Sequence, residues 1–169
     1  KFPLESSDGL FGLYAEATRN NWFYQLRFSH ISAHLADGAP NVANSYVYSR
    51  EFIVLRAARQ FAWFRPYAGI IYLVHTIPQN IPLLGVQAGF YAVPNIHWGK
   101  AYPYFGADYR GRGGREGNST NLSLGILLAS TEKAPPIRIA ANYFIGHDLR
   151  GQYLDQYIHK FSIGLELDF

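Results

Sequence analysis

A short stretch of the chain, Phe28-Ser29-His30-Ile31-Ser32-Ala33-His34, carries residue types that perform acyl transfer. A serine nucleophile needs an imidazole as its base and a carboxylate that holds the imidazole in position. His30 and Ser32 are two residues apart and therefore lie on one face of a strand. If the following hairpin is symmetric about Pro40-Asn41, Glu51 lies directly opposite His30, with Cβ atoms about 5 Å apart. We predict a catalytic triad in which Ser32 is the nucleophile, His30 the base and Glu51 the residue that orients His30.

Two other kinds of site have to be compared with this triad, a metal site and an anion-binding loop. His30 and His34 are four residues apart on one strand, about 13 Å, which is too far to chelate one ion. We therefore expect neither a metal nor another cofactor. A glycine-rich segment, Gly111–Ser119, contains or follows Arg110, Arg112 and Arg115, which predicts a loop that binds lipid phosphate. The alternative is a solvated, flexible loop.

The elements that position these residues are best seen at the end of the chain, in Gln156–Phe169. Apolar side chains occupy every second position, and the residues between them are polar, glycine or charged, apart from Ile158. The apolar positions near the end are Phe161, Ile163, Leu165, Leu167 and Phe169. A strand sends alternate side chains to opposite faces, and a membrane barrel turns the apolar face to lipid and the polar face to its lumen.

The same alternation divides the rest of the chain into strands of about ten residues, each long enough to cross a membrane when tilted. The predicted strands are Leu10–Thr18, Trp22–Ala33, Ser45–Ala58, Trp63–His75, Leu83–Ala92, Lys100–Arg110, Asn121–Ser130, Ile137–His147 and Gln156–Phe169. Single-chain bacterial barrels usually have an even number of strands. We therefore favour ten, with Lys1–Ser6 as a short additional strand, and keep eight as the alternative. The faces within Trp63–His75 cannot be separated from the sequence.

Composition agrees with a single β-barrel domain that spans residues 1–169. Aromatic residues make up 17% of the chain and charged residues 16%, compared with about 25% charged residues in soluble domains. No run of about 18 apolar residues predicts a transmembrane helix. The net charge of +3 leaves no nucleic-acid footprint. We expect the charged residues of the polar face to pair inside the barrel: Arg27, Arg50, Arg56, Arg138, Glu16, Asp108 and Glu166.

Two motifs resemble known bacterial families. The aromatic end of the alternating last strand resembles the C-terminal signal of outer-membrane β-barrels. His30, Ser32 and Glu51 resemble the His-x-Ser and Glu of lipid A deacylases, and the His-x-Ser also resembles outer-membrane phospholipase A. Ala33 stands where an Asn usually follows that serine, and the loop before Glu51 is longer. The segment is also similar to an uncharacterised family with His-x-Ser-x-His-Leu followed by Ser-Arg-Glu, here Ser49-Arg50-Glu51.

These resemblances imply a protein of the bacterial outer membrane whose lipid partners are lipopolysaccharide and phospholipid. They also imply that the loops at His34–Asn44, Thr76–Pro82, Gly111–Ser119 and Asp148–Tyr153 face outward. The predicted function is hydrolysis of a lipid acyl ester in the outer leaflet. Two alternatives remain: a non-catalytic barrel that anchors or contacts a protein partner, and a lipocalin-like binding barrel. The lipocalin-like barrel would require the apolar face to point inward.

Overall fold

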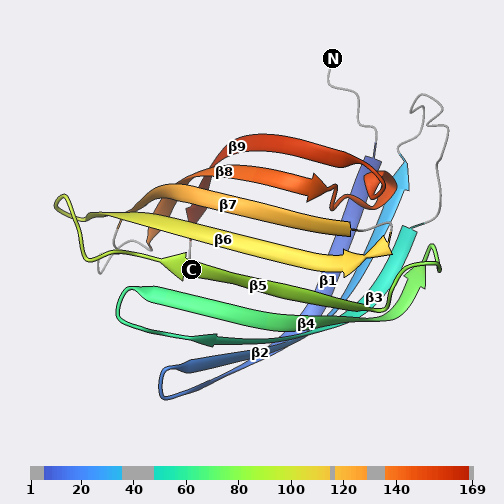
Figure 1. The fold of residues 1–169 in the computed structure, drawn as a ribbon, viewed down its shortest axis with the longest axis horizontal. Helices are drawn as coiled ribbons and strands as arrows, with labels where there is room; N and C mark the ends of the chain where they lie inside the picture. Colours follow the sequence, from blue (N-terminus) through green and yellow to red (C-terminus); the bar gives the residue numbers. More distant parts are fainter. Residues whose placement is uncertain (1–5, 36–47, 115–116, 129–135, 168–169) are drawn as a thin grey trace.

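A computed structural model describes residues 6–35, 48–114, 117–128 and 136–167, which form one antiparallel sheet (Figure 1). Neighbouring strands in the sheet are also neighbours in the chain, so the topology is a simple up-and-down meander. The strands are β1 (Ser6–Arg19), β2 (Trp22–Leu35), β3 (Tyr48–Arg59), β4 (Phe64–Ile77), β5 (Leu84–Ala92), β6 (Ala101–Gly113), β7 (Gly117–Leu128), β8 (Ile137–His147) and β9 (Tyr157–Leu167). A single turn of 3-10 helix, η2 (Gly151–Tyr153), lies between β8 and β9.

This architecture confirms the predicted all-β, antiparallel, up-and-down fold, and each predicted strand overlaps one observed strand. The strand count differs from both expectations: the described residues form nine strands, neither ten nor eight. The segment expected to supply a tenth strand ends at Ser6, which is the first residue of β1. Its first five residues lie outside the described part of the chain, as does Phe169 at the other end.

The sheet is strongly curved but open along one side. In Figure 1, β5–β9 form the near wall, and β1–β3 pass behind their right-hand end. Within the described residues, no ladder joins β1 to β9. Closure into a barrel therefore stays a prediction. The edge strand β1 has no cover on either face: every described side chain from Ser7 to Arg19 is exposed.

The two faces of the sheet have opposite chemistry. The inner face carries Arg27 of β2 and Arg50 and Arg56 of β3, and the outer face carries apolar side chains that are half exposed or more, among them Leu55, Leu84 and Leu124. This assignment agrees with the predicted alternation in β3, β5, β6 and β7. All three tryptophans, Trp22, Trp63 and Trp98, are exposed. They lie at the turns of one end of the sheet, which we call the tryptophan end. The described residues include no helix that is long and apolar enough to span a membrane.

The connection between β8 and β9 covers the opposite end of the sheet, which we call the η2 end. The backbone N–H of Gly151 donates a hydrogen bond to Asp8 Oδ2 of β1 at 3.2 Å. Leu154 is 3% exposed and packs in a small apolar cluster with Ala33 of β2 and Tyr48 of β3. A side chain at Gly151 would overlap the Tyr48 ring, so the close approach requires glycine. The last connection of the chain thus contacts its first three strands.

Candidate active site

Three of the titratable side chains at the η2 end converge on the outer face of β2, β3 and β4. His30 is directly opposite Glu51 in the β2–β3 ladder, as the symmetric hairpin predicted. Glu51 is in turn opposite His75 in the β3–β4 ladder. Their side chains are on the same face as the exposed apolar residues Phe28 and Leu55, which places them outside the curved sheet. Directly opposed side chains in such ladders are close enough for a direct hydrogen bond.

Glu51 binds both imidazoles through their Nδ1 atoms. His30 Nδ1 lies 2.5 Å from Glu51 Oε1, and His75 Nδ1 lies 2.7 Å from Glu51 Oε2. An ionised carboxylate only accepts hydrogen bonds, so each Nδ1 must carry the proton. The Nε2 atom of His30 is then left as the proton acceptor in the neutral ring. This is the tautomer that a catalytic histidine requires when its Nε2 takes the proton of a serine.

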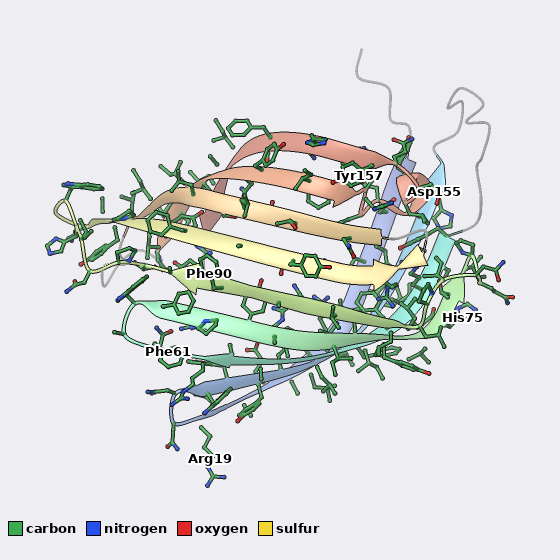
Figure 2. All side chains as sticks on the ribbon, viewed as in Figure 1. Arg19, Phe61, His75, Phe90, Asp155 and Tyr157 are labelled. Carbon is green, nitrogen blue, oxygen red and sulfur yellow. The ribbon has the colours of Figure 1, made fainter. Side chains whose placement is uncertain are left out.

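A β-bulge brings His75 to this site. The register shifts by one residue between Glu51 and Phe52, so Val74 has no partner in the β3–β4 ladder. Val74 and His75 are consequently both exposed, whereas Leu73 before them and Thr76 after them are buried. A bulge that re-aims a side chain in this way is common beside functional sites. Figure 2 shows His75 at the same end of the molecule as Asp155 of the β8–β9 connection.

Ser32 lies on the same face as His30, one step further along β2 toward the η2 end. It is opposite Ser49 in β3 and Gly9 in β1, and its hydroxyl lies beside the missing side chain of Gly9. Within the described residues, no hydrogen bond joins Ser32 to His30. Side chains two residues apart on a strand are about 7 Å apart at Cα, a gap that an imidazole and a hydroxyl span when both lean toward each other. Catalytic hydrogen bonds are often open in the ligand-free state.

An aromatic ring supports the imidazole from the β1 side. Phe11 is opposite His30 in the β1–β2 ladder, and their ring centroids are 4.8 Å apart with an angle of 30° between the planes. His30 is therefore held between Phe11 and Glu51, and 24% of its side chain is exposed. Glu51 is 26% exposed and His75 52% exposed. The site is thus a shallow one that a large substrate can reach from the outer side.

The other predicted site is built differently from what we expected. Arg110 and Arg112 do not lie in a loop: they belong to β6, whose ladder with β7 extends as far as the pair Gly113 and Gly117. Arg110 Nε donates to Asp108 Oδ1 at 2.9 Å. Arg112 Nη1 donates to the backbone oxygens of Pro82 and Leu83 at 3.1 and 2.9 Å. Arg115 lies outside the described residues. His34, the last polar residue of the β2 motif, is exposed and joins none of these contacts.

The interior arginines stack on aromatic rings as well as pairing with acids. Arg27 lies over the Phe52 ring, Arg56 over Tyr67, Arg50 over Tyr48 and Arg138 over Tyr91, at 4.6–5.8 Å from the ring centroids. Asp108 is the centre of the polar network that the structure describes there. It accepts hydrogen bonds from Tyr67, Gln87 and Arg110. Asp108 thus pairs with Arg110, which was not among the arginines predicted to pair inside the barrel. Glu16 bonds to the Gln25 amide at 2.7 Å. The side chain of Glu166 is outside the described set.

A serine beside a His–Glu pair can attack an acyl ester, and the described residues do not offer a metal site of three or more ligands as an alternative. The sequence predicted that His30, Ser32 and Glu51 share one face, which the β2–β3 ladder confirms. It did not predict the contact of His75 with Glu51 or the stacking of Phe11 on His30. Comparison of the chain with protein-family models, with curated proteins and with solved structures gave no match.

Proposed function

We propose that this protein is an outer-membrane lipid hydrolase, embedded as a β-barrel, whose active site is Ser32, His30 and Glu51. The observation that carries the proposal is the hydrogen bond from His30 Nδ1 to Glu51 Oε1 at 2.5 Å, on the outer face of the sheet. A carboxylate bound to Nδ1 both selects the reactive tautomer and stabilises the imidazolium that forms during acyl transfer.

The chemistry of the outer face supports a membrane location. Soluble monomers rarely expose apolar patches larger than a few hundred Å², yet here large apolar side chains are exposed on every strand. The exposed tryptophans gather at the tryptophan end, as expected for an aromatic girdle at a membrane interface. A strand edge within the hydrocarbon region would leave backbone groups unpaired, which costs several kcal/mol per group. In the membrane, β1 and β9 must therefore be paired, either with each other or with a further strand.

The position of the polar residues within this outer face supports a role in lipid chemistry. Polar side chains are expensive on a lipid-facing surface and are commonly functional there. His30, Glu51 and His75 form one row across the sheet, and the next row toward the tryptophan end is Phe28, Ile53 and Tyr72. The polar row thus lies at the edge of the apolar band, at the depth expected for the ester groups of the lipids.

The proposed reaction has two steps. Ser32 Oγ attacks the ester carbonyl carbon while His30 Nε2 takes the hydroxyl proton, and the lipid alcohol leaves with that proton. Water, activated by the same imidazole, then hydrolyses the acyl-serine and releases the fatty acid. Glu51 holds the imidazolium in both steps. Glu51 accepts hydrogen bonds from both Nδ1–H groups and stays ionised throughout.

The test is release of fatty acid from lipid A and from phospholipid by the purified, folded protein. Ser32→Ala should abolish turnover with a thermal unfolding curve like that of the wild type, because the hydroxyl has no hydrogen bond within the described residues. Ser49→Ala is the matched control: it removes the same atom from the directly opposed residue on the same face, and it should retain most of the turnover.

Two results would overturn the proposal. If the wild type releases no fatty acid from either lipid, the protein is a non-catalytic barrel. If Ser49→Ala is inactive and Ser32→Ala is active, the nucleophile is Ser49 and not Ser32.

A further inference from the structure

A second polar site lies on the other face of the sheet, away from the row of His30 and Glu51. It is a cavity of about 250 Å³ at the η2 end. Four arginines line it: Arg27 of β2, Arg50 of β3, and Arg110 and Arg112 of β6. Arg50 directly precedes Glu51 in the chain, and successive side chains of a strand point to opposite faces. The cavity is therefore separated from the proposed active site by the thickness of one sheet.

The carboxylates that the structure describes at and beside this cavity already have arginine partners other than Arg27. Asp148 is the one carboxylate among its described lining residues. It is already bound by Arg150, which donates to both of its oxygens through Nε, at 3.1 and 2.9 Å. Asp108, just outside the cavity, is bound by Arg110. Neither of these carboxylates therefore pairs with Arg27, which has no carboxylate partner among the described residues.

Arg27 is the clearest sign that a ligand is accommodated here. Its guanidinium stacks over the Phe52 ring at 5.7 Å from the centroid. Its Nε atom is buried and has no hydrogen-bond acceptor among the described residues. Buried donors in proteins are normally paired, so such an atom points to a missing acceptor. An oxyanion satisfies a donor of this kind and neutralises the Arg27 guanidinium at the same time.

The remaining walls of the cavity are apolar. Phe52 of β3, Leu73 of β4 and Leu154 of the β8–β9 connection line it together with several other aliphatic residues. Leu73 and Leu154 are 2% and 3% exposed, so the apolar wall consists of well-packed, buried side chains. The cavity volume of about 250 Å³ is large enough to hold more than a few water molecules. That space suits a charged head group with a short apolar segment.

We propose that this cavity binds an organic oxyanion: a phosphate or carboxylate head group held by Arg27 and its neighbouring arginines, with an alkyl segment against the apolar wall. The proposal concerns the inner face and does not depend on the hydrolase activity proposed for the outer face. It also replaces the expected phosphate-binding loop, because Arg110 and Arg112 contribute to a cavity between strands.

The experiment is calorimetric titration of the detergent-solubilised, folded protein with three probes: hexyl phosphate, inorganic phosphate and hexanol. Hexyl phosphate should bind most tightly. Inorganic phosphate should bind more weakly at the same site and compete with it. Hexanol should show no measurable binding, because it lacks the charge. Arg27→Gln should raise the Kd of hexyl phosphate by about tenfold or more, because hydrogen bonds to a charged donor are stronger than those between neutral groups. Arg27→Lys should recover part of the affinity.

Arg65→Gln is the matched control. Arg65 is also an inner-face arginine stacked on a ring, that of Phe23 at 4.5 Å, but it lies near the tryptophan end and does not line the cavity. It should leave hexyl phosphate binding unchanged. Equal weakening by Arg65→Gln and Arg27→Gln would overturn the proposal, because binding would then follow the overall charge. The proposal also fails if none of the probes binds. It fails as well if either hexanol or inorganic phosphate binds as tightly as hexyl phosphate.

Discussion

Replacing Glu51 by glutamine tests the proposed active site more sharply than any other single change. The variant keeps the shape of the side chain and removes its charge. Glu51 accepts two N–H groups, one from His30 and one from His75. A glutamine side chain offers one oxygen and one NH2 group, so only one of the two imidazoles retains its present hydrogen bond. At the other imidazole, the NH2 group faces an N–H and forces the ring to change its tautomer or to rotate.

The expected loss of activity follows from this geometry. In serine proteases, the equivalent change from carboxylate to amide lowers kcat by about 10⁴ through the wrong tautomer. Here the carboxylate is 26% exposed and water screens part of its charge. If the glutamine oxygen stays with His75, the full tautomer defect falls on His30. If it stays with His30, only the charge is lost. We therefore expect kcat to fall by about 10²–10³, equal to about 3–4 kcal/mol of transition-state stabilisation.

The folding stability should change far less than the rate. Hydrogen bonds to charged groups contribute about 1.5–3 kcal/mol where they are well buried. These two are a quarter exposed or more, so we expect a loss of about 1 kcal/mol at most. The assay is steady-state release of fatty acid, with kcat and KM measured separately, alongside thermal unfolding. Glu51→Asp is the companion variant, because it keeps the charge and shortens the reach. A Glu51→Gln protein that unfolds like the wild type and keeps kcat within twofold would refute the triad.

Three further outcomes are expected. His75→Ala should lower kcat less than tenfold, because Glu51 keeps its bond to His30; a larger drop, equal to that of Glu51→Gln, would make His75 the base. Labels at Leu124, which is on the outer face, should be quenched by lipid-bound quenchers, and labels at Ser123 should not; equal quenching at both would contradict the membrane location. Gly125→Ala should lower the free energy of unfolding by about 1–3 kcal/mol, because the new Cβ would overlap a backbone oxygen of β8 and crowd a tyrosine ring of β6. An unchanged unfolding temperature would show that β7 and β8 separate easily.

The register between β2 and β3 was predictable because an antiparallel hairpin has one mirror point. Placing that point at Pro40-Asn41 puts residue 30 opposite residue 51, and the ladder has this pair. The alternation of apolar and polar residues then fixed which face each side chain occupies. His30, Ser32 and Glu51 were thus placed on one face without knowledge of the loop between the strands.

The third member of the cluster could not be found in the same way. Strict alternation after the inward-facing Leu73 sends His75 inward as well. The bulge at Val74 inserts one residue and reverses that parity. The hydrophobic pattern of the sequence has no feature that marks such a bulge, because a valine suits either position in a strand.

The glycine-rich segment misled the prediction for a related reason. Glycines at this density are typical of a loop, yet Gly111 lies inside β6, where a Cβ would lie 2.8 Å from the Tyr109 hydroxyl and 3.1 Å from Asn118. Glycine in this sheet makes room for bulky neighbours rather than for a turn. A glycine-rich loop and a glycine-rich strand have the same composition. Only the packing against adjacent strands distinguishes the two.

The odd number of strands in the described part of the chain has a topological consequence. In a meander every strand reverses direction, so β1 and β9 run the same way, and Ser6 and Leu167 lie at opposite ends of the sheet. Direct pairing of β1 with β9 would therefore create a single parallel seam, with slanted hydrogen bonds, in an otherwise antiparallel cylinder. Such a seam would be the weakest line of the cylinder, and amides along it should exchange with solvent before those of any other ladder. An added strand between the two edges would instead keep every pairing antiparallel.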